Sequence, residues 1–297
     1  MNPLPDTLLQ KLNKEIQALG DLGPLTFVGS VGGGCINNAM QLAGKNDHYF
    51  LKWNWKSLPG MFAAEAYGLQ LLAASRSIRV PQVLAQGEAT PECPTFILLE
   101  WIESRGRFNQ AVCGEQLAAM HTVSTAGLFG LDQNNYIGST PQLNEPLGEW
   151  VAFFVQKRLQ PQIHLARQNG RLDINRQRRL ERFLKRLPDW LDGVKRQPVL
   201  LHGDLWGGNV MGGPEGEPVL IDPAVYYGDR ETDLAFTTMF GGFQADFYAA
   251  YQSVYPLEPD FEERFEIYNA YHLLNHLNLF GESYGRQLDA TLSRFVG

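Results

Sequence analysis

The chain has 297 residues, of which 44% are hydrophobic and 19% are charged, and its formal net charge is −7. This composition is typical of a globular protein, and a chain of this length buries about three quarters of its unfolded surface. A net negative charge disfavours general binding to nucleic acid and to anionic membrane surfaces. We therefore expect neither as a partner, and an anionic ligand would have to be bound by a few specifically placed groups.

The cysteines and the apolar segments predict where the protein is found. Three scattered cysteines, Cys35, Cys93 and Cys113, form no C-x-x-C pair, which argues against a disulfide scaffold and fits a reducing environment. The N-terminal segment has no long apolar run, and no segment approaches the roughly 20 apolar residues that span a bilayer. We expect a cytoplasmic protein without a signal peptide.

The first third of the sequence is rich in predicted strands. Helical periodicity and short apolar runs predict, in chain order, a helix at 6–19, strands at 25–31, 36–43 and 48–53, a helix at 61–74 and a strand at 95–99. Three consecutive glycines separate the first two strands, which is typical of a tight turn.

The remainder is dominated by long helical patterns. These cover 108–123, 147–168, 173–194 and 259–280, and one strand-rich island interrupts them at 199–221. We predict an α+β fold of two lobes with a ligand-binding cleft between them. The N-terminal lobe, residues 1–103, would contain a small antiparallel sheet, and the C-terminal lobe, residues 104–297, would be larger and helical.

The clearest chemical signal lies in the strand-rich island. Phosphoryl transfer needs a carboxylate near the attacking hydroxyl and oxygen ligands for Mg²⁺. Protein kinases provide these groups with H-R-D-x-x-x-x-N and a later aspartate, and Asp204 and Asn209 have the same spacing, with Asp222 following at the end of a strand. We predict that Asp204 is catalytic and that Asn209 and Asp222 bind the metal. The alternative, a hairpin with incidental acidic residues, does not explain three correctly spaced groups.

Two earlier segments are candidates for nucleotide binding. Lys52 lies in a predicted strand and Glu65 in the next helix, an arrangement in which the lysine binds phosphates and the glutamate holds it. The backbone amides of Gly32, Gly33 and Gly34 could bind phosphate oxygens. No Gly-Lys-Ser/Thr follows, so this is not a Walker A motif. A solvent-exposed lysine and a plain glycine hairpin are the alternatives for these two segments.

Three further side chains have weaker signals. Trp206 is two residues from Asp204 and could form a wall for a sugar ring. His272 and His276 lie four apart on a predicted helix but lack the glutamate of H-E-x-x-H, so we expect packing and not metal binding.

Cys35 follows the three glycines directly. A reachable thiol there, near positive potential, could be oxidised or could link two chains in a disulfide homodimer. The alternative is a small residue packed between two strands.

These motifs resemble those of the fructosamine (ketosamine) kinases. The similar segments span nearly the whole chain and are Gly-Gly-Gly-Cys-Ile-Asn, 136–142, 201–209, 222–235 and 274–281. The Trp after Gly-Asp-Leu and the run Asp-Pro-Ala-x-Tyr-Tyr-Gly distinguish the chain from the related aminoglycoside and choline kinases. The resemblance implies a protein-kinase-like fold, ATP and Mg²⁺ as cofactors, and phosphorylation of the sugar 3-hydroxyl of a ketosamine. The unstable phosphoester then leaves the amine, which is deglycation.

The resemblance also implies roles for individual residues. Asp204 would accept the proton, Asn209 and Asp222 would bind the metal, Lys52 would bind phosphates and Glu65 would hold it. The strand end formed by Glu100, Trp101 and Ile102 would bind adenine. Asp233 would brace the catalytic loop, and Asp229 stands where the family pattern leads us to expect histidine.

Two alternative functions remain at this point. The first is a kinase of the same fold that acts on another small amino-alcohol or an aminoglycoside. The second is a nucleotide-binding module without catalytic activity, which the presence of Lys52, Asp204, Asn209 and Asp222 disfavours.

Overall fold

The structure is a computed structural model that describes residues 4–32, 37–123, 127–193 and 196–297. It divides into two compact units. The first unit comprises Met1–Asn109 and Met211–Asp222, and the second comprises Gln110–Val210 and Pro223–Gly297. The lobe boundary at residues 103 and 104 stays a prediction. The structure adds that part of the strand-rich island belongs to the first unit.

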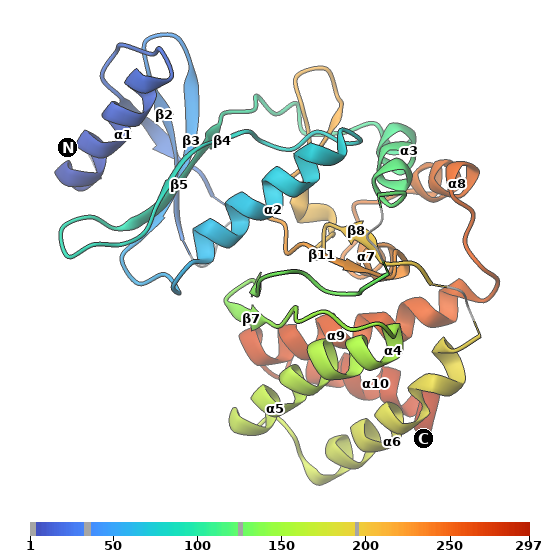
Figure 1. Ribbon diagram of the computed structural model, residues 1–297. Coiled ribbons are helices and arrows are strands. Elements are labelled where there is room, and N and C mark those ends of the chain that lie inside the picture. Colours follow the sequence, from blue (N-terminus) through green and yellow to red (C-terminus); the bar gives the residue numbers. More distant parts are fainter. Residues whose placement is uncertain (1–3, 33–36, 124–126, 194–195) are drawn as a thin grey trace. The chain divides into compact units, whose positions relative to one another are not determined.

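A five-stranded antiparallel sheet forms the centre of the first unit (Figure 1). The strands are, in their spatial order, β1 (Thr26–Ser30), β2 (Asn38–Ala43), β3 (His48–Asn54), β5 (Thr95–Glu100) and β4 (Val83–Gly87). The central position of β3 places Lys52 opposite Ala39 on one side and Ile97 on the other. The predicted α+β class with an antiparallel N-terminal sheet is confirmed, although β4 was not predicted.

Alternation along β3 separates two environments. Tyr49, Leu51 and Trp53 belong to a buried apolar cluster with Leu8 and Leu12 of helix α1 (Asp6–Ala18). Because successive side chains of a strand point to opposite faces, Lys52 faces away from this cluster. Helix α2 (Met61–Ser75) contacts β4 and β5 and carries Glu65. Figure 1 shows α1 and α2 flanking the sheet.

Asp21 fastens the segment before β1 to the turn between β2 and β3. Its carboxylate accepts hydrogen bonds from the Tyr49 hydroxyl (2.9 Å) and from the amides of Gly23 (3.2 Å), Lys45 (2.9 Å) and Asn46 (3.3 Å). Burial alone would raise the pKa of Asp21, but these hydrogen bonds lower it to about 2. The buried carboxylate therefore stays ionised and keeps this corner of the sheet in place.

A short hairpin, β9 (Val210–Gly212) and β10 (Pro218–Leu220), attaches the segment before Asp222 to the first unit. The amide of Leu220 donates to the carbonyl of Arg79 (2.9 Å), and the amide of Arg105 donates to Gly212 (3.2 Å). A Cβ atom at Gly212 would lie 2.2 Å from the carbonyl oxygen of Arg107, so this contact requires glycine. The hairpin thus brings Asp222 into the unit that contains Lys52.

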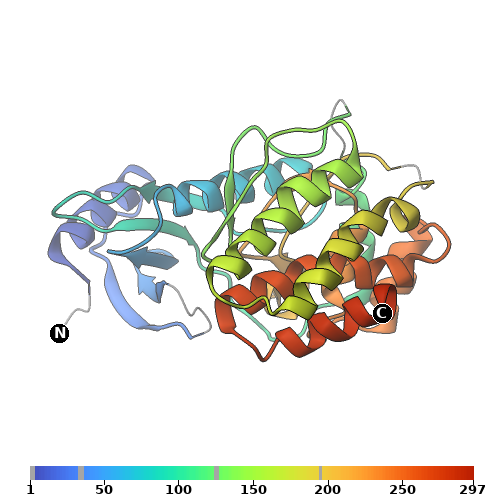
Figure 2. The ribbon, with the colours of Figure 1, turned by 90° about the horizontal axis from the view of Figure 1, so that it is seen from below.

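The second unit is mainly helical (Figure 2). Its helices are α3 (Gln110–Met120), α4 (Trp150–Phe153), the π-helix η1 (Phe154–Leu159), α5 (Gln160–Gln168), α6 (Ile174–Leu191), α7 (Glu231–Thr237), α8 (Ala245–Val254), α9 (Phe261–Phe280) and α10 (Gly285–Val296). Helix α9 is buried along most of its length and packs against α5, α7 and α10. Gly114 lets α3 approach α8 closely, because a Cβ there would lie 2.2 Å from the carbonyl oxygen of Phe247.

Two small hairpins complete the second unit. Strands β6 (Asn135–Ile137) and β7 (Thr140–Gln142) pair with each other, and β8 (Val199–Leu201) pairs with β11 (Tyr226–Gly228). The helix predicted at 147–168 is present but contains the π-helical turn. The β6–β7 hairpin and helices α8 and α10 were not predicted. Within the described residues, every helix is too short or too polar to cross a membrane.

Candidate functional site

Lys52 forms the charged centre of the first unit. Its ammonium group donates to Glu65 Oε1 at 2.8 Å and is in close contact with Asp222 Oδ1. Burial alone would lower the pKa of Lys52, but the carboxylates of Asp222 and Glu65 outweigh it and raise that pKa. The lysine is therefore charged, and the Lys52–Glu65 contact that the sequence suggested is present.

Asp222 has an unusual backbone conformation. Its φ is +54°, in the left-handed region that costs a residue with a Cβ on the order of 1–2 kcal/mol. Its side chain is 48% exposed, and its backbone follows β10 at the end of the segment that belongs to the first unit. Local strain of this kind is common where a side chain must be presented to a ligand. The carboxylate of Asp222 is accessible to a cation.

In the second unit, Asn209 holds the carboxylate of Asp204. The Asn209 amide nitrogen donates to the main-chain oxygen of Asp204 (2.8 Å) and to its Oδ2 (3.0 Å). The short 3₁₀ turn η2 (Gly207–Asn209) produces this geometry. Asn209 is buried and Asp204 is half-buried. Within the described residues, the Asn209 side-chain oxygen has no hydrogen-bond donor, so it can still serve as a metal ligand.

Asn209 in the second unit and Asp222 in the first each offer oxygen to a cation that keeps other ligands. Among the described residues, no group of three His, Cys, Asp or Glu side chains could hold a metal alone. Mg²⁺ is commonly bound through one or two protein oxygens together with substrate phosphates and waters. Asn209 and Asp222 each offer one oxygen group of that kind.

Asp233 of α7 fixes the main chain before Asp204. Its two carboxylate oxygens accept the amides of His202 (2.7 Å) and Gly203 (2.8 Å), and His121 lies 3.2 Å away. Gly203 has φ +81°, and a Cβ there would lie 2.0 Å from the carbonyl oxygen of Ala224. The structure thus places Asp233 where the resemblance implied a brace.

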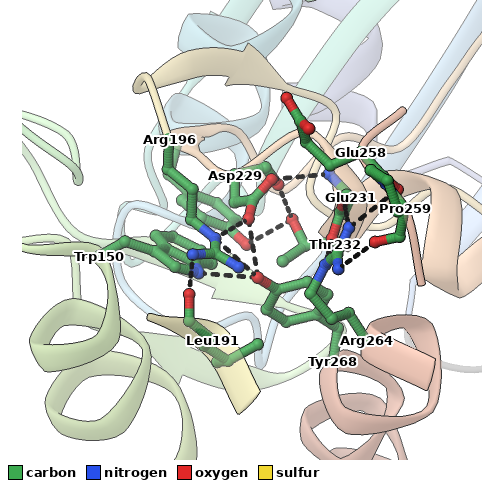
Figure 3. A network of polar contacts seen from close by, with 11 residues as sticks. Trp150, Leu191, Arg196, Asp229, Glu231, Thr232, Glu258, Pro259, Arg264 and Tyr268 are labelled. Atoms are coloured by element: carbon green, nitrogen blue, oxygen red, sulfur yellow. Dashed lines mark hydrogen bonds and ion pairs between the residues drawn. The ribbon is translucent and has the colours of Figure 1, made fainter. Parts of the chain in front are cut away.

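Asp229, the position that departs from the expected family pattern, is buried in a polar network (Figure 3). Its Oδ2 accepts from Arg196 Nε (2.5 Å) and from the Tyr268 hydroxyl (2.7 Å), and the Tyr268 oxygen accepts from Trp150 Nε1 (3.0 Å). A buried carboxylate with these hydrogen-bond partners has a structural role. Asp229 therefore supports the turn that enters α7 and does not face a ligand.

Glu231 and Arg264 form a second buried pair beside this network (Figure 3). The guanidinium of Arg264 binds Glu231 with two hydrogen bonds of 2.7 and 2.6 Å. A buried charge pair of this kind becomes strongly destabilising when one partner is removed. The pair joins the first turn of α7 to the start of α9, which also helps to position Asp233.

Trp206 packs against two neighbours although its side chain is partly exposed. A Cβ atom at Gly208 would lie 2.3 Å from the indole ring, so the ring covers this glycine. The other contact is with Phe240, whose ring centroid is 5.7 Å away at an angle of 75°. Gly207 packs against the loop that contains Gly241. A Cβ atom at Gly207 would lie 2.6 Å from the carbonyl oxygen of Gly241. The sequence indicated Trp206 but not Phe240.

At the strand end predicted to bind adenine, one of the three main-chain amides has no hydrogen-bond acceptor within the described residues. The amide of Glu100 donates to Gln82 (3.0 Å), and the amide of Trp101 donates to His48 (3.2 Å). Ile102 follows the strand, and its amide has no hydrogen-bond acceptor within the described parts of the chain. Of the three residues, Ile102 is therefore the one whose amide is available to a base.

The glycine loop is described only in part. Gly32 lies in an irregular segment, and a Cβ placed there would meet no atom of the described residues within 4 Å, whereas Gly33, Gly34 and Cys35 lie outside the described residues. The other two cysteines are buried. Burial raises the pKa of the Cys93 thiol, and it raises the pKa of Cys113 to about 12, so neither is a reactive thiolate.

Comparison with known proteins gives consistent matches. The model of the family described as fructosamine kinase matches residues 10–296. The chain is 41% identical over 268 residues to the chloroplastic protein-ribulosamine 3-kinase of Arabidopsis thaliana, covering 89% of this chain and 81% of the relative. A crystal structure from Haemophilus somnus, provisionally named fructosamine-3-kinase, is similar with a TM-score of 0.87 and 26% identity over 99% of both chains.

A more distant structure is similar in fold alone. It is a thermostable mutant of aminoglycoside phosphotransferase APH(4)-Ia in ternary complex with ADP and hygromycin B. The TM-score is 0.66 and the identity 15%, with 98% of this chain and 99% of that chain covered.

The packing of Trp206 over Gly208 can be tested by adding one methyl group. Gly208→Ala should displace the indole, because the new Cβ would overlap the ring while the exposed side chain is free to turn away. We expect the indole N–H resonance of Trp206 to shift in a proton–nitrogen NMR spectrum with little change in melting temperature. Gly148→Ala, where a Cβ meets nothing within 4 Å, is the matched control. An unmoved resonance in Gly208→Ala would contradict the packing.

Proposed function

The chain belongs to the fructosamine kinase family, and on this basis we propose that it phosphorylates the sugar 3-hydroxyl of ketosamines with ATP. The protein is an ATP-dependent kinase, and its similarity to an aminoglycoside phosphotransferase confirms the protein-kinase-like fold. The observation that carries the proposal is the Asp204–Asn209 loop, braced by Asp233, in a chain that matches the family almost throughout. Loss of the phosphoester from the sugar then frees the amine.

Asp204 is proposed to accept the proton of the sugar hydroxyl as the phosphoryl group is transferred. Asn209 donates to Oδ2 of this carboxylate, which orients it, and the carboxylate is half-buried, so a substrate can still reach it. Phosphoryl transfer is catalysed mainly by positioning and electrostatic stabilisation, and an oriented carboxylate can accept the proton of the attacking hydroxyl. Asp233 acts on the same loop through the main chain.

Nucleotide binding is proposed for residues of the first unit. The charged Lys52, held by Glu65, would bind phosphate oxygens, and the amides of Gly32, Gly33 and Gly34 would contribute further donors. The free amide of Ile102, next to Glu100 and Trp101, would bind the adenine edge.

Mg²⁺ is proposed as the metal that accompanies ATP. It would be held by the side-chain oxygens of Asn209 and Asp222, and when bound it neutralises charge on the phosphates. The open Asp222 carboxylate and the unused Asn209 oxygen support this assignment.

The acceptor is proposed to be a sugar bound to an amine. The net charge of −7 favours an acceptor that carries an ammonium group, and the half-exposed Trp206 offers a face for the sugar. The same charge is the reason why we propose no nucleic-acid or membrane partner, and the scattered cysteines support a cytoplasmic location.

The proposed function is tested by comparing acceptors. We expect ADP release with fructosyl-lysine or ribulosyl-lysine at a kcat/KM far above that with free fructose. Asp204→Asn should lower kcat by at least about 100-fold while ATP still binds, because only the proton acceptor is lost. Asp189→Asn, an exposed carboxylate on α6, is the control and should keep full activity. Equal kcat/KM for fructose and its lysine adduct, or an active Asp204→Asn, would refute the proposal.

The metal assignment predicts a different defect for Asp222. Asp222→Ala should weaken Mg-ATP binding about tenfold or more in isothermal titration, because a charged ligand is removed. Asp260→Ala controls for the backbone, since Asp260 also has a left-handed conformation (φ +61°) but precedes α9. If Mg-ATP affinity is the same in wild type and Asp222→Ala, the assignment is wrong.

A disulfide-linked homodimer through Cys35 is a further proposal. Cys93 and Cys113 are buried with raised thiol pKa values, so they should not compete for oxidation. With hydrogen peroxide, two Cys35 thiols would form one disulfide and two waters. Wild type should then run as a dimer on a non-reducing gel and return to monomer with thiol reductant, whereas Cys35→Ala should stay monomeric. A monomer band for oxidised wild type would exclude this dimer.

A further inference from the structure

Trp206 is the first member of a row of aromatic side chains in the second unit. Its ring contacts Phe240 at 5.7 Å, and Phe240 contacts His276 at 5.2 Å. His276 lies 4.9 Å from Tyr284 and 5.4 Å from Phe280, and these two rings are 6.0 Å apart. All these centroid distances lie in the range of favourable aromatic contacts. The row is therefore continuous from the loop of Asp204 to the end of α9.

The side chains of the row are partly exposed to solvent, so a ligand could bind over them. Trp206 is 37% exposed, Phe240 39% and Phe280 56%, and His276 and Tyr284 are half-buried. Single exposed aromatic residues are common, but a continuous exposed patch is typical of a binding surface. These side chains come from three separate segments, namely the catalytic loop, the α7–α8 connection and the α9–α10 corner. Tertiary packing, and not local sequence, assembles the patch.

The row is longer than one sugar. A sugar ring is about the size of one aromatic ring and stacks on one such face. A sugar whose hydroxyl faces Asp204 would cover Trp206, two residues away. Phe240, Phe280 and Tyr284 would then lie beside whatever the sugar is attached to.

His276 gives this surface a hydrogen-bond acceptor. Its Nδ1 lies 2.8 Å from the carbonyl oxygen of His272, and because a carbonyl can only accept, Nδ1 carries the proton. Burial lowers the pKa of His276, so the ring is neutral and Nε2 has a free lone pair. Within the described residues, Nε2 has no hydrogen-bond partner. An ammonium group can donate to this nitrogen and also bind the neighbouring ring faces.

We propose that Phe240, His276, Phe280 and Tyr284 form a subsite for the amine-bearing arm of the acceptor, which is a protonated secondary amine and the alkyl chain beyond it. The proposal rests on the proposed function, because it takes Asp204 as the point where the sugar hydroxyl lies. It adds residues that determine which amine is accepted. The ring faces bind the ammonium and the chain in the ground state, so they act on KM and not on the chemical step.

The test compares two acceptors that carry the same sugar. One is fructose linked to methylamine, which has almost no arm, and the other is fructose linked to the side-chain nitrogen of lysine within a short peptide. Phe280→Ala should raise KM for the peptide about fivefold to tenfold with kcat unchanged, because one ring face is lost. KM for the methylamine adduct should change less than twofold.

The matched control is Phe261→Ala. Phe261 is the first residue of α9, as Phe280 is the last, and its ring packs on Phe265 at 5.2 Å. This variant should leave both KM values unchanged. An equal effect of Phe280→Ala on both acceptors, or none on either, overturns the subsite. Loss of self-association or of lipid-vesicle binding in Phe280→Ala with unaltered kinetics also overturns it, because the surface would then serve a second copy or a membrane.

Failure of the proposed function gives a separate result. If wild type phosphorylates neither acceptor, that function is refuted, and isothermal titration with the same two compounds decides the subsite alone. Weaker binding of the peptide adduct only, in Phe280→Ala but not in Phe261→Ala, supports the subsite. Equal affinities of wild type and Phe280→Ala for the peptide adduct overturn it.

Discussion

The contact of Asp233 with two consecutive main-chain amides controls the geometry of the catalytic loop. Because the amides of His202 and Gly203 both point at one buried carboxylate, the chain must turn at Gly203 with a positive φ. That turn presents the side chain of Asp204 and leads into the short helical turn that brings Asn209 back to it. Everything on this loop depends on where α7 lies, and the buried pairs at its start fix that position.

The fold was largely predictable where a pattern was long and regular. The helix of Leu8 and Leu12 and most strands of the sheet follow from apolar periodicity. Short elements were missed: β4 is half-exposed and β6 and β7 have three residues each, too few for alternation to be distinctive. Helix α10 was also missed, although Leu288 and Leu292 lie four residues apart on its buried face, which is the spacing of an amphipathic helix.

The site was predictable where it depends on spacing. The interval between Asp204 and Asn209 fixes a local turn, and the structure contains that turn. The contact of Lys52 with Glu65 follows from a strand next to a helix, and the roles of these residues stay predictions. The burial of Asp229 was not predictable, since Arg196 and Tyr268 are distant in sequence. The aromatic row was not predicted for the same reason, because no local sequence pattern links Phe240 to the α9–α10 corner.

The discontinuity of the first unit has a consequence for how the protein is made. Its sheet is encoded before residue 110, but the segment 211–222, which ends at Asp222, is encoded after about a hundred residues of the second unit. During synthesis from the N-terminus, the five-stranded sheet is therefore complete in sequence, but the first unit still lacks residues 211–222 while α3 to α6 emerge from the ribosome. A fragment ending at Asn109 would lack the partner strands for Arg79 and Arg105. The first unit is thus encoded by two stretches of the sequence with part of the second unit between them.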